Sequence, residues 1–309
     1  MTSVATRVRH FLSIADLSSE EMDRLLDDAD ALKRDPVPRD APLRGRALAM
    51  IFEKPSLRTR LSFDVAMRDL GGDSSYLSPQ EVGLGRRESV ADVARVVSRY
   101  VDVVVLRTFA HETLEEFAKY SSVPVINGLS DLSHPCQGLA DIFTVRERKG
   151  TLRDVVAAYV GDGNNVAHSF MLAAAKTGMT LRVASPAGFE PLPRYRELAE
   201  AAARSTGARI TYGQDPVSAV RDADVVYTDV WTSMGQEQEY ERRRRAFQGF
   251  QVNRDLLARA KPDAIVLHDL PAHRGEEITD DVIDGPQSAV FDQAENRLHT
   301  QKAVLRWIA

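Results

Sequence analysis

The sequence predicts an α/β protein with two doubly wound parallel-sheet domains. Short apolar runs alternate with segments of helical spacing, the alternation starts again after Gly150, and 309 residues suffice for two domains of about 150 residues each. Parallel strands are covered by helices on both faces, so they appear as continuous apolar runs. We expect a first domain over 1–145, a second over 146–292, and a C-terminal helix over 293–309 that packs back on the first domain.

The first domain is expected to begin with a helix and to continue as alternating strands and helices. Ser18 and Glu21 form a capping-box pattern ahead of apolar residues spaced three and four apart, which is typical of a helix start. Uninterrupted apolar runs predict strands at 47–52, 101–106 and 123–126. Helical spacing predicts helices from about Arg58 to Gly71, near 88–99, near 112–120 and over 135–148.

The second domain repeats this alternation. Helical spacing predicts a helix over 166–176 and a closing helix over 293–308. The sequence shows no repeat of short period, which argues against a repeat architecture. Apolar runs predict strands at 155–161, 181–184, 225–228 and 264–268.

Composition and charge exclude several classes of protein. Hydrophobic residues make up 43% and charged residues 28%, as in ordinary globular proteins, and the formal net charge is −5. A protein that coats nucleic acid or an anionic membrane needs a basic surface, so neither partner is expected. The most apolar stretch, 101–106, is far shorter than the roughly 20 residues that span a bilayer. The one cysteine, Cys136, allows no intrachain disulfide and 1–17 contains no signal-peptide core, so we expect a cytoplasmic protein.

Four consecutive arginines, Arg242–Arg245, could be taken for a nucleic-acid patch. Acidic residues at 237, 239 and 241 directly precede them. Because mixed charge of this kind is typical of a solvated helix face, we interpret the run in that way.

The strongest functional signal is the segment FEKPSLRTR, Phe52–Arg60, between a predicted strand and a helix start. Cations at a helix N-terminus oppose the helix dipole, so Arg58 and Arg60 are locally unfavourable unless an anion lies among them. Backbone N–H groups, the hydroxyls of Ser56 and Thr59 and the Arg58 guanidinium could together hold a phosphate or carboxylate. The alternative is that both arginines only pair with surface acids.

Two further motifs of the first domain follow predicted strands. Arg107 comes directly after the strand 101–106, at the edge where ligands bind in doubly wound sheets, and is expected to meet the same anion. In HPCQ, 134–137, Pro135 would begin a helix, His134 can donate to a carbonyl oxygen, and Gln137 offers a donor and an acceptor. Taken singly, each of these side chains also fits a structural or solvated role.

Three polar loops of the second domain also follow predicted strands. GDGNN, 161–165, opens a helix but lacks the third glycine and the acid of a dinucleotide site, and its two adjacent amides suit a carboxylate. In DVWTSMGQE, 229–237, Asp229 can pair with an ammonium group or cap a turn. In HDLPAHRGEE, 268–277, no third ligand at a recognisable spacing joins the two histidines and Asp269, so no metal site is expected.

Taken together and in this order, these motifs resemble those of the ornithine carbamoyltransferases, within the aspartate and ornithine carbamoyltransferase superfamily. The resemblance extends from Arg46 to FDQAENRLHT, 291–300, and the intact SMG motif, 233–235, distinguishes it from the aspartate carbamoyltransferases. It implies a carbamoyl-phosphate domain, an amino-acid domain and a homotrimer with sites between subunits. It also implies transfer of the carbamoyl group to the side-chain amine of L-ornithine, which gives L-citrulline, without a metal or organic cofactor.

The same resemblance implies roles for individual residues. The phosphate would be held by Ser56, Leu57, Arg58, Thr59 and Arg107. The carbamoyl group would be held by His134, Gln137, Arg297 and the carbonyl of Leu270, and ornithine by Asn165, Asp229, Ser233 and Met234. The neutral amine would attack the carbamoyl carbon and phosphate would leave, while the arginines and His134 offset the charge on oxygen.

Three positions depart from the family pattern. Leu57 replaces the usual Thr of the STRTR motif, and Glu81 stands near the place where many relatives carry a Gln that reaches a neighbouring subunit's site. Asp269 is the third, because the chain has HDLP where the family has HCLP, with its Cys near the reacting amine. Two alternatives therefore stay open: carbamoyl transfer to another amine, such as putrescine, lysine or an acylated ornithine, or ligand binding with impaired turnover.

Overall fold

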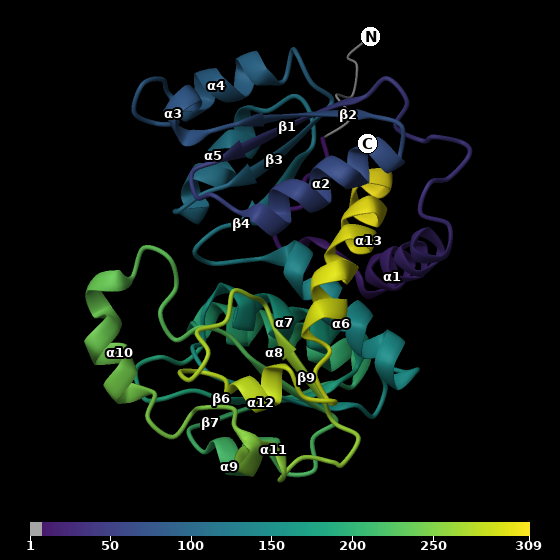
Figure 1. Ribbon diagram of the computed structural model, residues 1–309. Helices are drawn as coiled ribbons and strands as arrows, with labels where there is room; N and C mark the ends of the chain where they lie inside the picture. The colour runs from purple at the N-terminus through teal and green to yellow at the C-terminus, as the bar shows by residue number, and fades with distance from the viewer. Residues whose placement is uncertain (1–7) are drawn as a thin grey trace. The chain divides into compact units, whose positions relative to one another are not determined.

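The computed structural model describes residues 8–309, which form two compact units (Figure 1). The first comprises the residues up to Leu17, Arg24–Cys136 and Leu298–Ala309, and the second comprises Ser18–Asp23 and Gln137–Arg297. Residues 1–7, the start of the segment expected to lack a signal-peptide core, lie outside the described part. Three helices contribute residues to both units, namely α1 (Ser19–Arg34), α6 (Pro135–Lys149) and α13 (Val290–Ile308).

A parallel sheet in the order β2–β1–β3–β4 forms the centre of the first unit. Its strands are β1 (Ala47–Phe52), β2 (Asp73–Leu77), β3 (Val103–Arg107) and β4 (Val125–Leu129). The sequence predicted three of them and missed β2, because this edge strand is polar and partly exposed. Its backbone pairing with β1, rather than an apolar run, makes β2 a strand.

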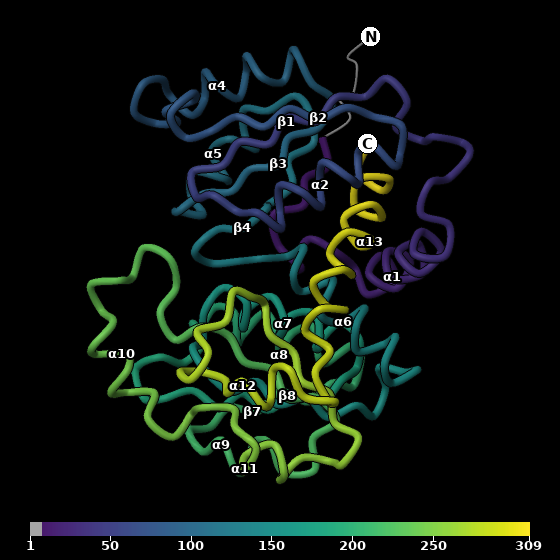
Figure 2. The backbone as a smooth tube through the Cα atoms, in the orientation of Figure 1, coloured from purple at the N-terminus to yellow at the C-terminus, as the bar shows by residue number. Residues whose placement is uncertain are grey.

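Helices cover both faces of this sheet. Helices α4 (Val90–Val97) and α5 (His111–Tyr120) share one apolar core with β1 and β3. The C-terminal turns of α13 run beside α2 (Leu57–Asp69) (Figure 2). The fully buried Lys302 of α13 pairs there with Asp69 of α2. A buried ammonium group needs such a partner, so this pair ties the C-terminal helix to the first unit and confirms the predicted packing. The remaining elements are η1 (Ile14–Asp16) and α3 (Pro79–Val82).

The second unit contains a parallel sheet in the order β7–β6–β5–β8–β9. Four of its strands were predicted to within about two residues, whereas the edge strand β7 was missed because its side chains alternate between exposed and half-buried. The predicted α/β fold with two parallel sheets is therefore confirmed. The strands are β5 (Val156–Val160), β6 (Thr180–Ala184), β7 (Arg209–Gly213), β8 (Val225–Thr228) and β9 (Ile265–His268).

Helix α7 (Asn165–Thr177) is buried over most of its length and packs on this sheet through Phe170, whose ring meets the edge of Tyr227 at 5.0 Å. A second core, which includes Val160, Val226 and Phe247, also takes in residues of three short helices, α9, α11 and α12. The arginine run, expected on a helix face, lies on α10 (Tyr240–Ala246). The sequence did not predict the other helices of this unit: α8 (Pro193–Thr206), α9 (Pro216–Val220), η2 (Glu237–Glu239), α11 (Arg254–Leu257) and α12 (Asp280–Ile283). Within residues 8–309, no helix combines the length and the apolar character needed to cross a membrane.

Candidate functional site

The strand order reverses at one place in each sheet, between β1 and β3 in the first unit and between β5 and β8 in the second. In open parallel sheets, ligands bind outside the carboxyl ends of the strands at such a switch point. The segment that begins at Glu53 and residue Arg107 lie at the first switch point. The GDGNN loop and Asp229 lie at the second.

The start of α2 is shaped by Ser56. This residue has an extended backbone and caps the helix, since its Oγ accepts from the N–H of Thr59 at 3.3 Å. The two hydroxyls also form a hydrogen bond at 3.1 Å. Leu57 opens the helix with its side chain 77% exposed, so the leucine that replaces the usual Thr occupies no core position. Arg58 follows in the first turn and is only partly exposed.

Arg107 is the last residue of β3 rather than the first residue after it. Its register partner on β1 is Phe52, and its carbonyl oxygen accepts from the N–H of Glu53 at 2.8 Å. The Glu53 carboxylate in turn accepts from the N–H of Phe109 at 2.9 Å. These bonds join the segment after β1 to the segment after β3, so the structure brings Arg107 to the same sheet edge as the start of α2.

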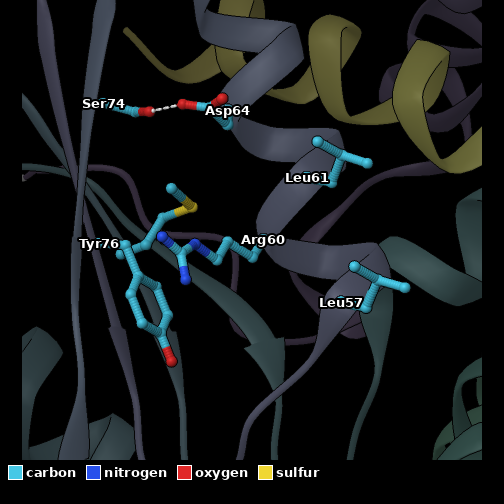
Figure 3. A pocket seen from close by; sticks show the side chains of 7 residues that line it. Leu57, Arg60, Leu61, Asp64, Ser74 and Tyr76 are labelled. Atoms are coloured by element: carbon cyan, nitrogen blue, oxygen red, sulfur yellow. Dashed lines mark hydrogen bonds between the residues drawn. The ribbon is translucent and has the colours of Figure 1, made fainter.

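Arg60, the second cation of the motif, contacts the edge strand β2. Its guanidinium stacks over the ring of Tyr76 at 4.0 Å, in a cavity of about 380 Å³ between α2 and β2. Figure 3 shows the Arg60 side chain reaching toward Tyr76, beside the hydrogen bond between Ser74 and Asp64. An aromatic ring therefore stabilises this cation, while the expectation that an anion lies between Arg58 and Arg60 stays a prediction.

His134 directly precedes α6 and is almost fully buried. A network that the sequence did not predict supports the preceding loop: Asn127 donates to the carbonyl of Ser133 at 3.3 Å, and Ser130 Oγ lies 2.7 Å from His111 Nδ1. Asn127 has no exposed surface. The only sequence signal was an amide directly after the predicted strand 123–126.

At the second switch point, Asn164 connects the two polar loops. Its Oδ1 caps α7 by accepting from the N–H groups of Val166 and Ala167, and its Nδ2 donates to Asp229 Oδ2 at 2.8 Å. Asn164 was missed as a site residue, although its position before a helix start was a capping signal. Asn165, the predicted residue, begins the helix and is 9% exposed.

Glycine is required at position 163 of this loop. A Cβ at Gly163 would lie 2.1 Å from the backbone nitrogen of Pro191, which no side chain tolerates. The loop is therefore pressed against the segment before α8, and this contact fixes the position of Asn164.

Asp229 is 5% exposed, and its surroundings destabilise the ionised form of its carboxyl group. Burial raises the pKa of Asp229 to about 7, and the charge of Asp269 adds to the shift, while His268 and the bond from Asn164 oppose it. A cation bound beside Asp229 would reverse this shift. The site therefore favours a ligand with a positive charge.

Asp269 and Arg297, both predicted as site residues, lie together in the second unit. Arg297 Nη1 is 4.0 Å from Asp269 Oδ1, and Arg297 is 2% exposed. The next residue, Leu270, has φ 62°, a left-handed conformation that costs a non-glycine residue roughly 1–3 kcal/mol. Its N–H donates to His268 Nδ1 at 2.8 Å, which holds this conformation in place.

The loop that carries Ser233 and Met234 lies at the surface of the second unit, and Met234 is 51% exposed. Its base is fixed by Arg243, which donates to the Trp231 carbonyl at 2.9 Å and to Asp162 at 2.7 Å. Arg243 is 6% exposed, so the interpretation of the arginine run as a solvated face is wrong for this residue. Burial raises the pKa of Asp162 to about 6, and the charge of Arg243 opposes this shift.

The HDLP segment and the acidic residues that follow it make local contacts. His268 Nε2 lies 3.0 Å from the buried Glu277, and ligand atoms of His273, Glu276 and Glu277 come within 4.8 Å of one another. Tyr240 donates a hydrogen bond to Glu276 at 2.6 Å, so protein groups already stabilise these acids.

Glu81 makes a local contact in the first unit. It accepts a hydrogen bond from the N–H of Ser78 at 2.6 Å in a capping box, and hydrogen bonds from Ser78 lower the pKa of Glu81.

Two family models match nearly the whole chain. Residues 9–147 match the carbamoyl-P binding domain of aspartate/ornithine carbamoyltransferase, and residues 153–308 match its Asp/Orn binding domain. An ornithine carbamoyltransferase from Pyrococcus abyssi is 55% identical over 305 residues, which cover 98% of this chain and 96% of that protein.

Solved structures are similar over the same length. Ornithine carbamoyltransferase from Pyrococcus furiosus has 55% identity and a TM-score of 0.92, with 96% of each chain covered. An N-acetyl-L-ornithine transcarbamylase mutant complexed with PALAO has 32% identity and a TM-score of 0.90, with 98% of this chain and 100% of that chain covered. The matches to both domain models and to relatives of this identity place the chain in the aspartate/ornithine carbamoyltransferase family, among its ornithine carbamoyltransferases.

Proposed function

We propose that the two switch points divide the substrates of this carbamoyltransferase between them. The chain transfers the carbamoyl group of carbamoyl phosphate to the side-chain amine of L-ornithine and so makes L-citrulline. Residues 1–145 with 293–309 bind carbamoyl phosphate, and residues 146–292 bind ornithine. The names of the matching domain models support this division.

One observation carries the proposal: the first switch point is cationic and the second is acidic. Arg58, in the first turn of α2, and Arg107, at the end of β3, suit a phosphate. Asp229, whose pKa is raised by burial, suits the α-ammonium group of an amino acid. Carbamoyl phosphate is an anion and suits the cationic switch point, whereas ornithine carries ammonium groups and suits the acidic one.

Each candidate residue then has a defined role. Ser56, Leu57 and Thr59 hold the phosphate together with the two arginines, through hydroxyl and backbone N–H groups. His134 donates to the carbamoyl oxygen, while Arg297, Gln137 and the Leu270 carbonyl orient the carbamoyl amide. On the amino-acid side, Asn165 binds the α-carboxylate and Asp229 the α-ammonium, and Ser233 and Met234 cover the ligand.

The reaction needs a neutral nucleophile. The neutral side-chain amine of ornithine attacks the carbamoyl carbon and forms a tetrahedral intermediate. The attacking nitrogen then gives up a proton, and phosphate leaves with the bonding electron pair and takes up that proton. The arginines stabilise the leaving phosphate and His134 stabilises the charge on the carbamoyl oxygen. No residue in this sequence of steps requires a metal or an organic cofactor.

The assembly and its location are part of the proposal. A homotrimer would cover the exposed side chains of Leu57 and Leu61, which line the cavity between α2 and β2 and are 77% and 57% exposed. A net charge of −5 and the single Cys136 support a cytoplasmic location and argue against nucleic-acid and membrane partners.

Choice among amines tests the assignment of Asp229. With carbamoyl phosphate saturating, kcat/KM for ornithine should exceed that for putrescine at least about 100-fold, because putrescine leaves Asp229 and Asn165 without their ligand groups. N-acetylornithine should also be a poor substrate, since its acylated α-nitrogen carries no charge for Asp229. Steady-state release of phosphate that depends on the added amine, with lysine and aspartate as further acceptors, measures these ratios.

A matched variant tells whether Asp229 sets the ratio. Asp229→Asn keeps the shape of the side chain and removes its charge, so it should lower kcat/KM for ornithine and leave that for putrescine little changed. Equal kcat/KM for ornithine and putrescine in the unmodified chain would sink the ornithine assignment. A preference for N-acetylornithine would support transfer to an acylated ornithine instead.

A further inference from the structure

A chain of hydrogen bonds in the second unit connects β9 to Gln137. The backbone N–H of His268 donates to Gln293 Oε1 at 2.8 Å, and Gln293 Nε2 donates to Asp141 Oδ1 at 2.6 Å. Gln137 Nε2 donates to the same carboxylate oxygen at 2.8 Å. Asp141 and Gln293 are fully buried, and Gln137 is 1% exposed. Asp141 thus accepts one hydrogen bond from an amide of α6 and one from an amide of α13.

This chain fixes which way each amide points. A backbone N–H can only donate, so Gln293 must turn its oxygen to His268 and its nitrogen to Asp141. Asp141 Oδ1 accepts, and Gln137 therefore also turns its nitrogen to Asp141. The oxygen of Gln137 points elsewhere; it is buried and has no hydrogen-bond partner within residues 8–309. A buried acceptor of this kind is unfavourable until a donor reaches it.

We propose that Asp141 is a positioning residue that aims the Gln137 oxygen at the NH2 group of carbamoyl phosphate. The inference rests on the proposed contact between Gln137 and the carbamoyl group. It extends that contact to substrate choice, because an acyl phosphate without the NH2 group, such as acetyl phosphate, would leave this oxygen without a donor.

The protonation of Asp141 does not change this orientation. Burial raises the pKa of Asp141 to about 8, the bonds from Gln293 and Gln137 oppose the shift, and Asp269 adds to it. Oδ1 already accepts two hydrogen bonds, so a proton on Asp141 belongs on Oδ2, which has no hydrogen-bond partner among the described residues. The buried hydroxyl of Tyr227 is another polar group that acts on Asp141. Oδ1 remains the acceptor for Gln137 in both states.

The first test is Asp141→Asn, which keeps the shape and adds a donor. The new amide can donate to the Gln137 oxygen if Gln137 flips, and Gln137 would then present its NH2 group to the carbamoyl NH2 group. We expect kcat/KM for carbamoyl phosphate to fall about 10- to 100-fold. The Kd of inorganic phosphate, measured by calorimetry, should stay within about twofold, because the proposed phosphate contacts lie elsewhere in the chain.

The second test restores the orientation by exchanging the two groups. In Asp141→Asn combined with Gln137→Glu, the introduced carboxylate can accept from the introduced amide and still offer an oxygen to the carbamoyl group. The double variant should regain at least about tenfold of the lost kcat/KM. Gln137→Glu alone places two acids side by side and should be less active than the double variant.

Thr144→Val is the matched control. It breaks the hydrogen bond from Asn296 at 2.9 Å, also between α6 and α13, without touching Gln137. We expect a lower Tm with kcat/KM for carbamoyl phosphate nearly unchanged. Equal losses of kcat/KM in Thr144→Val and Asp141→Asn, or no recovery in the double variant, would overturn the positioning role. Absence of citrulline formation by the unmodified chain would instead overturn the proposed function.

Discussion

Replacement of Arg58 by alanine should lower kcat/KM for carbamoyl phosphate by at least about 100-fold, because a charge-assisted phosphate contact of this kind contributes about 3 kcal/mol. Arg58 follows Ser56 and Leu57 in the first turn of α2, where its charge opposes the helix dipole. Because the Arg58 charge is unfavourable for the helix, we expect that this side chain binds an anion. Stability should therefore behave differently from activity. The Tm of Arg58→Ala should be unchanged or slightly higher, since the variant removes an unfavourable cation.

The same helix offers a control for this variant. Arg68 is almost three turns further on, pairs with Asp64 at 2.7 Å, and has a side chain that is 69% exposed. An exposed pair of this kind contributes about 0–1 kcal/mol, so Arg68→Ala should change kcat/KM by less than about twofold. A loss of less than about fivefold in Arg58→Ala would remove Arg58 from the phosphate site.

Replacement of Asp269 by cysteine should raise kcat at neutral pH and move the rising limb of the pH profile to lower pH. An ionised carboxylate near the attacking nitrogen favours the ammonium form of ornithine, whose pKa by analogy with lysine is about 10.4. At about 4 Å and an effective dielectric of about 20, the interaction is roughly 4 kcal/mol, an upper bound near 3 pKa units. The charge of Arg297, 4.0 Å from Asp269, reduces this effect.

A second consequence of the substitution has the same sign. Asp229 must be ionised to pair with the α-ammonium of ornithine, and the charge of Asp269 helps to raise the pKa of Asp229 to about 7. Removing that charge lowers the pKa of Asp229, so the binding-competent form appears at lower pH. The rising limb of kcat/KM for ornithine should therefore shift in the same direction as that of kcat.

Asp269→Asn separates the charge from the thiol. It removes the carboxylate without adding a sulfur, so it should reproduce the pH shift but not necessarily the full gain in kcat. Both variants are measured as pH profiles of kcat and of kcat/KM for ornithine. If Asp269→Cys leaves the profile unchanged or reduces kcat, Asp269 points away from the amine or serves as a base, and its carboxylate does not hold the amine in the ammonium form.

The sequence by itself determined the fold class and the strand ends at which candidate residues lie. Continuous apolar runs specify central parallel strands, because such strands are buried on both faces. Ser56 and Arg58 were identified from the conflict between a cation and a helix start, which is a local signal. The edge strands β2 and β7 escaped prediction, because pairing with a neighbour rather than apolar burial makes them strands.

Other features depended on contacts between residues far apart in the chain. Arg60 and Arg58 are alike in sequence, and only the packing of α2 beside β2 directs Arg60 to Tyr76. The acceptor role of Asp141 depends on Gln293, a residue 152 positions away. Tertiary structure decided these points, because the direction of a side chain and the pKa of a buried acid are set by neighbours that the local sequence does not contain.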